Sequence, residues 1–292
     1  MGELEKFFGW DLDFVNLSGG RSPIPVRMLV SENITVFDIR FHDRIHQRGL
    51  PPSEVLTFGL PIHGIKDWFG KPMDSGILLP FNQPNGIDSV NRAGFFGQII
   101  CVKKDFLKQV AAVTQTPAPN SLWRPTTGSH FPSSIQLHQI QEMLMHSLQS
   151  GEWVDKGDDE AELVVSLLKA ARSGAQPADR ITRCAKTRSM KKALEYIECH
   201  ARDAPSVSEI CTEMGIAWRT MDRAFKERFD MGPKAYILRY RLNKVREKLE
   251  SNRPQRSVGD AANAWGFWHM GQFARDYRKL FGELPSTTIH RV

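Results

Sequence analysis

One stretch of this chain decides how its C-terminal half folds, and it reads Gly266-Phe267-Trp268-His269-Met270-Gly271-Gln272-Phe273-Ala274-Arg275-Asp276-Tyr277-Arg278-Lys279-Leu280-Phe281-Gly282-Glu283-Leu284-Pro285. Side chains of the same kind occur about 50 residues earlier. At an offset of 52 the matched pairs are Met221 and Phe273, Arg223 and Arg275, Phe225 and Tyr277, Phe229 and Phe281, and Pro233 and Pro285. At an offset of 51 they are Val207 and Val258, Glu209 and Asp260, and Gly215 and Gly266. Because a repeated sequence predicts a repeated structural unit, we expect two copies of one motif.

Each copy carries the local signals of a helix-turn-helix. A capping box, which satisfies the free backbone N–H groups at a helix start, is expected at Ser206 with Glu209 and at Ser257 with Asp260. Each first helix then ends at a glycine, Gly215 or Gly266, because glycine adopts the left-handed conformation of a tight turn. The second helix of each copy is expected at residues 217–229 and 268–281.

The second helices have an apolar face and a polar face. Met221 and Phe225 face the core in the first copy, and Phe273 and Tyr277 do so in the second. The opposite or N-terminal surfaces carry the polar side chains that read base edges in a major groove. We expect DNA contacts at Trp218, Arg219, Thr220, Asp222, Arg223, Trp268, His269, Gln272 and Arg275. For the two tryptophans, two interpretations stay open: contact with thymine methyl groups, or shielding of the helix ends.

A third helix is expected to join the two copies, with Pro233 as its first residue. Its apolar residues recur at 4, 3, 4 spacing and would hold both copies against it: Leu238, Leu242, Val245 and Leu249. Its other faces carry Arg239, Arg241, Lys244, Arg246 and Lys248. Each cation alone fits a solvated surface as well as a phosphate contact, whereas the set favours phosphate contact, with Arg239 and Lys244 as our candidates.

Charge is divided unevenly along the chain. The 292 residues have a net charge of +6, with 39 Lys and Arg against 33 Asp and Glu. Residues 180–292 contain 23 basic and 13 acidic side chains, a net of +10, which leaves 16 and 20, a net of −4, for residues 1–179. Two ordinary domains could differ in this way, but clustered cations are also what phosphate binding requires.

Residues 188–292 resemble the DNA-binding domain of AraC/XylS-type transcription regulators. The matching text is Ser206-Val207-Ser208-Glu209-Ile210, residues 215–226, Arg241-Leu242 with Leu249, and the whole of residues 266–285. The resemblance implies an all-α domain of seven helices, with two helix-turn-helix units joined by a linker helix. It also implies binding of double-stranded promoter DNA in successive major grooves about 10 base pairs apart, and RNA polymerase as a partner.

Three residues depart from the family pattern. Ala217 stands where the family has a serine cap, which removes a bond worth about 1 kcal/mol. Asp230 replaces the glycine that is present at Gly282 in the second copy, and aspartate tolerates the left-handed region better than most residues. Ala261 stands where the family favours isoleucine, and we expect Trp265 to fill the space.

The N-terminal half is rich in predicted strands and makes the fold class α+β. Strands are expected at residues 26–30, 34–41, 54–60, 62–69, 77–81 and 95–102, separated by Gly and Pro turns, which predicts an antiparallel sandwich or barrel. The family resemblance implies a cupin-like sensor barrel for a small-molecule effector. Its candidate lining residues are Phe37, Phe41, Phe58, His63, Trp68 and Phe96. The competing interpretation is that these side chains pack in an ordinary core.

Helices follow the strands at residues 103–113 and at two apolar stripes within residues 133–172. These two middle helices would either form a homodimer interface or pack on the barrel. We therefore expect an effector-sensing and dimerisation domain at 1–172, a linker at 173–187, and the DNA-binding domain at 188–292.

No catalytic residue, metal site or cofactor is predicted. His42 and His46 lie four apart in an arginine-rich turn and His63 stands alone, which is not the ligand spacing of a metal cupin. The alternatives are a regulator without a ligand, a cupin-type enzyme fused to a DNA-binding domain, or an alkyl-DNA repair protein. The last would need a cysteine cluster near the N-terminus, and residues 1–100 contain no cysteine.

Composition bounds the remaining classes of protein. With 41% apolar and 25% charged residues the chain is typical of soluble globular domains. The N-terminus lacks a secretory signal pattern, and no stretch reaches the roughly 18 apolar residues of a membrane span, so we expect a cytoplasmic protein without a membrane partner. The four cysteines show no CxxC spacing, so we expect small buried side chains and no zinc or disulfide.

Overall fold

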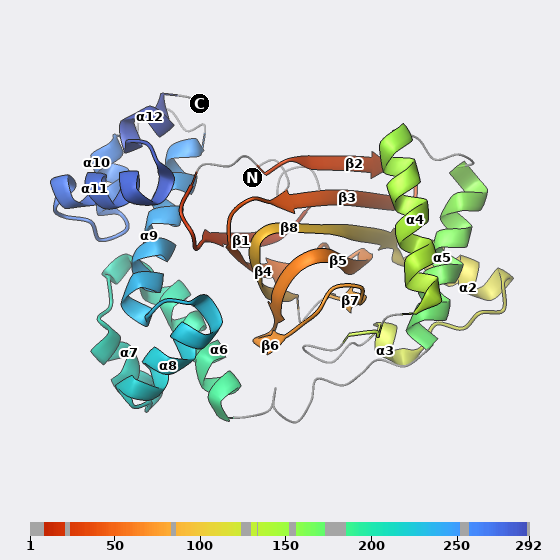
Figure 1. Cartoon of the computed structure of the whole chain (residues 1–292), viewed down its shortest axis with the longest axis horizontal. Helices are drawn as coiled ribbons and strands as arrows, with labels where there is room; N and C mark the ends of the chain where they lie inside the picture. The colour runs from red at the N-terminus through yellow and green to blue at the C-terminus, as the bar shows by residue number, and fades with distance from the viewer. Residues whose placement is uncertain are drawn as a thin grey trace. The chain divides into compact units, whose positions relative to one another are not determined.

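The computed structural model describes residues 9–20, 24–82, 86–123, 130–132, 134–151, 156–172, 185–251 and 257–290. The chain forms two compact units (Figure 1). The first contains Met1–Asp13, Pro23–His42 and Gln47–Asp179. The second contains Arg180–Val292 together with two N-terminal segments, Phe14–Ser22 and Asp43–His46. The predicted linker lies outside the described residues up to residue 184, and its last three residues belong to a helix.

The strands that the structure describes all belong to one eight-stranded sheet. The strand order is β1-β4-β8-β3-β2, and β5 pairs with β6, β7 and β8. The strands are β1 (Asp11–Asn16), β2 (Val26–Val30), β3 (Ile34–Phe41), β4 (Ile45–Leu50), β5 (Val55–Trp68), β6 (Lys71–Pro72), β7 (Leu79–Pro80) and β8 (Ile87–Lys103). The pairs of β3 with β2 and β8, and of β5 with β6, β7 and β8, are antiparallel, as predicted.

Two long strands, β5 and β8, give the sheet its curvature (Figure 1). Their register shifts at three places between Pro61 and Asp67, and such bulges bend and twist a strand. Two strands were predicted here, at 54–60 and 62–69, and the structure has one continuous strand, β5. The strands β1, β4 and β6, and residues 87–94 of β8, were not predicted. His46, predicted to lie in a turn, is in β4 and is buried.

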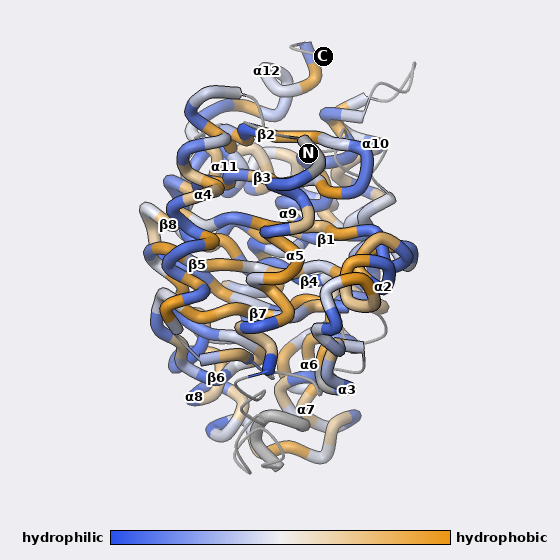
Figure 2. Tube along the Cα trace, turned by 90° about the vertical axis from the view of Figure 1, so that its right-hand side faces the viewer, coloured by the Kyte–Doolittle hydropathy of each residue, from blue (hydrophilic) through white to orange (hydrophobic). Residues whose placement is uncertain are grey.

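Helices cover one face of the sheet. They are α2 (Lys104–Val113), α3 (Asn120–Trp123), α4 (Ile135–Ser150) and α5 (Lys156–Arg172). Their apolar stripes, including Leu144 and Leu167, form one core with residues of β3, β5 and β8 such as Val36, Phe58 and Ile100. Figure 2 shows apolar residues recurring along α5 and β5. The two middle helices thus contribute to the core of this unit.

The C-terminal part of the second unit is all helical, as predicted. Its elements are α6 (Ala185–His200), the 3-10 turn η2 (Ala201–Asp203), α7 (Val207–Met214), α8 (Trp218–Phe229), α9 (Pro233–Glu250), α10 (Val258–Asn263), α11 (Met270–Phe281) and α12 (Pro285–Ile289). Both capping boxes form, at Ser206 with Glu209 and at Ser257 with Asp260. The two helix-turn-helix motifs are α7 with α8 and α10 with α11.

Helix α9 joins the two motifs and shares a core with each. Tyr236 stacks against Phe225 and Phe229 of the first motif. Farther along α9, the predicted apolar residues Leu242, Val245 and Leu249 pack with the aromatic residues of the second motif, and Leu238 packs at the edge of the same cluster. Figure 1 shows α9 running between α8 and α11. The linker helix therefore packs against both motifs.

Candidate DNA-binding surface

Helix α8 is the predicted recognition helix of the first motif. Gly215 adopts a left-handed conformation, with φ +62°, and turns the chain from α7 towards α8. Met221 and Phe225 are buried, as expected, and the N-terminal end of α8 is exposed at Trp218, Arg219 and Thr220. Because Ala217 offers no side-chain cap, the first turn of α8 has unsatisfied N–H groups that a DNA phosphate could accept from.

Helix α11 is the predicted recognition helix of the second motif, and it begins later than expected. It starts at Met270, so Trp268 and His269 precede the helix and lie in the turn that leads into it. Phe273 and Tyr277 are buried, whereas Gln272 and Arg275 are exposed. The turn itself is tight at Gly266, where a side chain would meet the carbonyl oxygen of Arg202 at 2.8 Å.

Polar contacts organise the exposed faces of the two helices differently. On α8, Lys226 pairs at 2.8 Å with Asp222, a predicted contact residue, so the carboxylate of Asp222 already has a partner within the helix. Arg223 pairs with Glu227 at 3.8 Å. On α11, Arg275 donates to Gln272 Oε1 at 2.9 Å, and Gln272 Nε2 donates to Asp276 at 2.9 Å. The second helix therefore presents an oriented pair of side chains, Gln272 and Arg275.

The cations of the linker helix are less exposed than the sequence suggested. Lys244 pairs with Glu247 at 2.9 Å and has 18% of its side chain exposed. Arg239 is half-buried, and its Nη1 has no hydrogen-bond partner among the described residues. Burial, followed by repulsion from Arg44, lowers the pKa of Arg239. Arg241 donates to the carbonyl of Trp265 at 2.8 Å and lies over the ring of Phe267, so it binds the second motif to α9.

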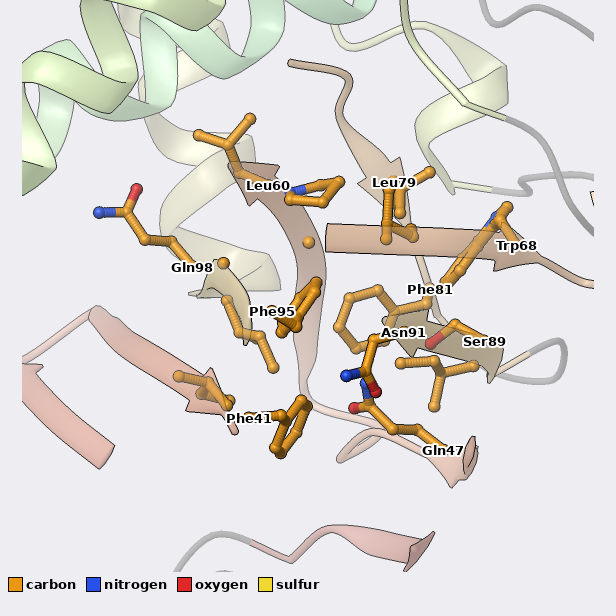
Figure 3. Close-up of a pocket in the computed structure, with 17 residues that line it drawn as sticks. Phe41, Gln47, Leu60, Trp68, Leu79, Phe81, Ser89, Asn91, Phe95 and Gln98 are labelled. Carbon is orange, nitrogen blue, oxygen red and sulfur yellow. The ribbon is translucent and has the colours of Figure 1, made fainter. Parts of the chain in front are cut away.

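A separate site lies in the first unit, where a cavity of about 40 Å³ opens on the sheet (Figure 3). Its lining is mostly apolar, with four aromatic side chains, Phe41, Trp68, Phe81 and Phe95, among aliphatic ones. Every polar side chain of the lining is uncharged. Gln47, Ser89 and Asn91 lie together at one side of the rings, whereas the amide of Gln98 points away from them (Figure 3).

Two of the six predicted lining residues, Phe41 and Trp68, lie at this cavity. Phe58 is buried in the core beneath the helices, and Phe37 is buried beside Trp10. His63 is exposed, and Phe96 is half-buried under the guanidinium of Arg40 at 4.3 Å. Sequence reasoning missed Gln47, Ser89 and Asn91, because they belong to strand segments that were not predicted.

The described part of the chain contains no group of three His, Cys, Asp or Glu side chains placed to hold a metal ion. Cys101 is buried against Thr57, and burial raises the pKa of its thiol to about 12. Cys211 is buried with its sulfur 3.8 Å from that of Met221, and burial raises its pKa too. Both are packing residues, as predicted, whereas Cys199 is exposed and does not fit that prediction, and Cys184 lies outside the described residues. Among the described helices, none is long and apolar enough to span a membrane.

Three comparisons place this architecture among known proteins. The model of a helix-turn-helix domain family matches residues 210–291. The XylDLEGF operon transcriptional activator 3 of Pseudomonas putida is 33% identical over 104 residues, which is 35% of this chain and 31% of that protein. The chain thus matches about a third of the length of this curated relative.

Solved structures include a probable AraC family transcriptional regulator from Rhodopseudomonas palustris. It is 33% identical, with 36% of this chain and 96% of that chain covered, at a TM-score of 0.34. The structure of ToxT from Vibrio cholerae matches 97% of this chain and 98% of that chain at 9% identity and a TM-score of 0.34. The repeated motif, its linker helix and the matched segments lead to one conclusion: the C-terminal part of the chain is a helix-turn-helix domain similar to that of AraC/XylS-type transcription regulators.

Proposed function

We propose that α8 and α11 enter two successive major grooves of promoter DNA and read its sequence. The observation that carries this proposal is the equivalence of Arg223 and Arg275, which lie 52 residues apart in the repeat and are both exposed opposite buried cores. An exposed arginine on a recognition helix offers the two parallel donors that guanine accepts in the major groove. Gln272, held by Arg275 and Asp276, supplies the second polar contact of α11.

The tryptophans extend this surface. Trp218 is 56% exposed and Trp268 is 73% exposed, which is unusual for such large apolar side chains. Trp218 is the first residue of α8, and Trp268 lies in the turn just before α11, so both are near the helix end that approaches the bases in helix-turn-helix complexes. Contact with thymine methyl groups or sugars would cover this apolar surface on binding. Thr220, Arg219 and His269 complete the proposed contact set.

The experiment starts from duplexes with a randomised centre, from which the purified protein selects a bound sequence. Replacement of Arg223 or Arg275 by Ala is expected to weaken binding of that sequence by about 1–3 kcal/mol and to relax the preference at one base pair. Lys108→Ala, on α2 in the other unit, is the matched control for loss of a surface cation. Unchanged affinity and unchanged base preference in both arginine variants would contradict the assignment.

We assign Arg239 and Lys244 to phosphate contact. Lys244 has to exchange Glu247 for a phosphate, and Arg239 has to leave a half-buried position. Each contact that forms releases about one counterion, so an alanine variant should lower the slope of log affinity against log salt by about one. A slope equal to that of the wild type would remove that residue from the interface.

We further propose that the cavity of the first unit binds a small uncharged effector. Its aliphatic and aromatic walls suit an apolar body, and Gln47, Ser89 and Asn91 suit one polar group that carries no charge. At about 40 Å³ the cavity holds only a few water molecules, so a larger ligand has to widen it. A thermal-shift screen of neutral metabolites tests this; hits with wild type that vanish in Trp68→Ala support it. A screen without hits favours a regulator that acts without a ligand.

Two partners complete the proposal. A homodimer would cover exposed apolar side chains of α4, where Ile135 is 70% exposed and Met145 is 39% exposed. Light scattering should then give twice the 33.2 kDa mass of one chain. RNA polymerase is the second partner, and transcription from a template that contains the selected site should increase when the protein is added. The protein on this proposal acts by binding and carries out no reaction.

A further inference from the structure

Two short segments from the N-terminal half, residues 14–20 and 43–46, belong to the same compact unit as the two helix-turn-helix motifs. The two segments are held together by hydrogen bonds. Leu17 N–H donates to the carbonyl of Arg44 at 2.7 Å, and the backbone N–H of Arg44 donates to the hydroxyl of Ser18 at 2.9 Å. The amide of Asn16 donates to Asp43 at 3.3 Å. We call this bonded pair of segments the clamp.

The clamp binds the end of the first recognition helix. Arg44 Nη2 donates to the carbonyl oxygen of Phe229, the last residue of α8, at 2.6 Å. The same nitrogen pairs with the carboxylate of Asp230 at 2.6 Å. Cations at a helix C-terminus interact favourably with the helix dipole, and hydrogen bonds to charged groups are the stronger ones. Arg44 therefore fixes the C-terminal end of α8.

His46 strengthens this attachment from within the core. Its Nδ1 is 2.8 Å from the hydroxyl of Tyr236 on α9, and each of the two residues is only 1% exposed. Its ring lies 5.0 Å from that of Phe229. A buried polar pair of this kind has few alternative partners, so it fixes the position of the clamp on the junction between α8 and α9.

The clamp also reaches the linker helix and the second recognition helix. Asn16 N–H donates to Asn243 Oδ1 at 3.1 Å, and Asn243 Nδ2 donates back to the carbonyl of Asn16 at 3.4 Å. Gly20 N–H donates to the carbonyl of Leu280, in the last turn of α11, at 2.7 Å. The clamp thus contacts the C-terminal ends of both recognition helices and the helix between them.

These contacts explain a departure in the repeat. Asp230 occupies a left-handed position, φ +55°, where the second motif has Gly282. A glycine would adopt this conformation with less strain, so aspartate has a local cost there. The carboxylate of Asp230 is the partner of Arg44, which gives the residue a role that glycine could not fill.

We propose that the clamp fixes the separation and angle of the two recognition helices, with Arg44 and Asn16 as positioning residues for DNA binding. The inference rests on the proposed function, since it requires both helices to bind one DNA molecule. Helix α9 and the contact of Arg202 with Trp265 also join the motifs. The clamp adds a further connection, at the helix ends, and so restricts rotation of one motif against the other.

The test measures how much the affinity for DNA falls when the distance between the two recognised boxes is changed. The wild-type protein selects a two-box sequence from randomised duplexes, and two base pairs are then inserted between the boxes, which rotates one groove relative to the other. Wild-type affinity should fall about 10-fold or more. In Arg44→Ala the fall should be less than about 3-fold, while affinity for a duplex with one box alone stays unchanged.

Asp230→Gly is the second variant, because it removes the carboxylate partner and favours the left-handed conformation, so α8 stays intact. Like Arg44→Ala, it should reduce the loss of affinity that the insertion causes. The control is Arg92→Ala, which changes an exposed arginine of the other unit and should show the same loss as the wild type. Failure of the wild-type protein to select two boxes would contradict the proposed function. The wild-type protein could select two boxes while Arg44→Ala and Asp230→Gly both keep the full loss of affinity on insertion. That result would contradict the proposed role of the clamp and leave the proposed function standing.

Discussion

The two helix-turn-helix motifs are close copies in sequence, yet their equivalent residues have different surroundings. Gly215 turns the first motif in open space, with no atom within 4 Å of where a side chain would lie. Gly266 turns the second motif against the backbone of η2 and the guanidinium of Arg241. The first recognition helix ends at an aspartate bound by Arg44, and the second ends at a glycine. A sequence repeat therefore predicts the local backbone of each motif well, but it predicts poorly which residues from elsewhere in the chain surround that motif.

The turn glycines should give the largest difference between the motifs. Gly266→Ala adds left-handed strain and brings Cβ to 2.8 Å from the carbonyl oxygen of Arg202, so we expect a loss of about 3 kcal/mol in the free energy of unfolding. Gly215→Ala adds the strain alone and should cost about 1 kcal/mol. Urea titration of both full-length variants measures the difference. Equal losses would show that contact at Gly266 is relieved by small shifts.

An aromatic pair should give the next largest difference. Tyr277 and Phe225 are equivalent in the repeat, but the hydroxyl of Tyr277 hydrogen-bonds Thr288 at 2.9 Å, and Thr288 donates to Glu283 at 3.0 Å. Phe225→Tyr places a hydroxyl in an apolar core and should cost about 2 kcal/mol. Tyr277→Phe leaves a partly satisfied network and should cost about 1 kcal/mol. Thermal unfolding of the two variants compares them, and a neutral Phe225→Tyr would indicate an accessible partner in the first motif.

The helix caps provide a stabilising change. Ala217 already has the extended backbone of an N-cap residue, so Ala217→Ser should add a side-chain bond and stabilise the protein by about 1 kcal/mol. His269→Ser, at the N-cap of α11, is the comparison, because its ψ of 89° is less suited to capping and the gain should be smaller. Unfolding midpoints in urea give both values. A larger gain at His269 would contradict the backbone argument.

The smallest effect concerns pH. In the capping box of α7, the backbone N–H of Ser206, followed by its hydroxyl, holds the pKa of Glu209 below its usual range. Since the pKa is lower in the folded state, the stabilisation is present above the unfolded-state pKa and is lost as the pH falls through the folded-state pKa. An NMR titration of the Glu209 carboxylate measures the shift, and Ser206→Ala should raise this pKa part of the way back. A Glu209 pKa at its usual value in the wild type would refute the bond.

Features that depend on neighbours in sequence were predictable. The capping boxes, the left-handed Asp230 and the missing cap at Ala217 all appear in the structure, because each depends on a few consecutive residues. The lining of the cavity was not predictable in the same way. Long strands such as β5 are buried on both faces, so an aromatic residue can face the cavity, as Trp68 does, or the helices, as Phe58 does.

Strand β4 is the clearest case of a structure that its own residues do not indicate. Ile45-His46-Gln47-Arg48-Gly49-Leu50 is largely polar, and its pairing partners lie elsewhere in the chain. The contacts of Arg44 and His46 are with Phe229, Asp230 and Tyr236, which are far from them in sequence. His46 and its partner Tyr236 are 190 residues apart in sequence.

Local sequence patterns were enough to predict the two motifs, their linker helix and the resemblance of this domain to one family, because helix starts, turns and apolar spacing are set by interactions within one or two turns of chain. Three features depend on the tertiary structure: the strand faces that line the cavity, the lack of room for a side chain at Gly266, and the contacts of the N-terminal segments with both recognition helices. Those features arise from contacts between distant residues, and such contacts are specified by shape and burial that no local pattern records.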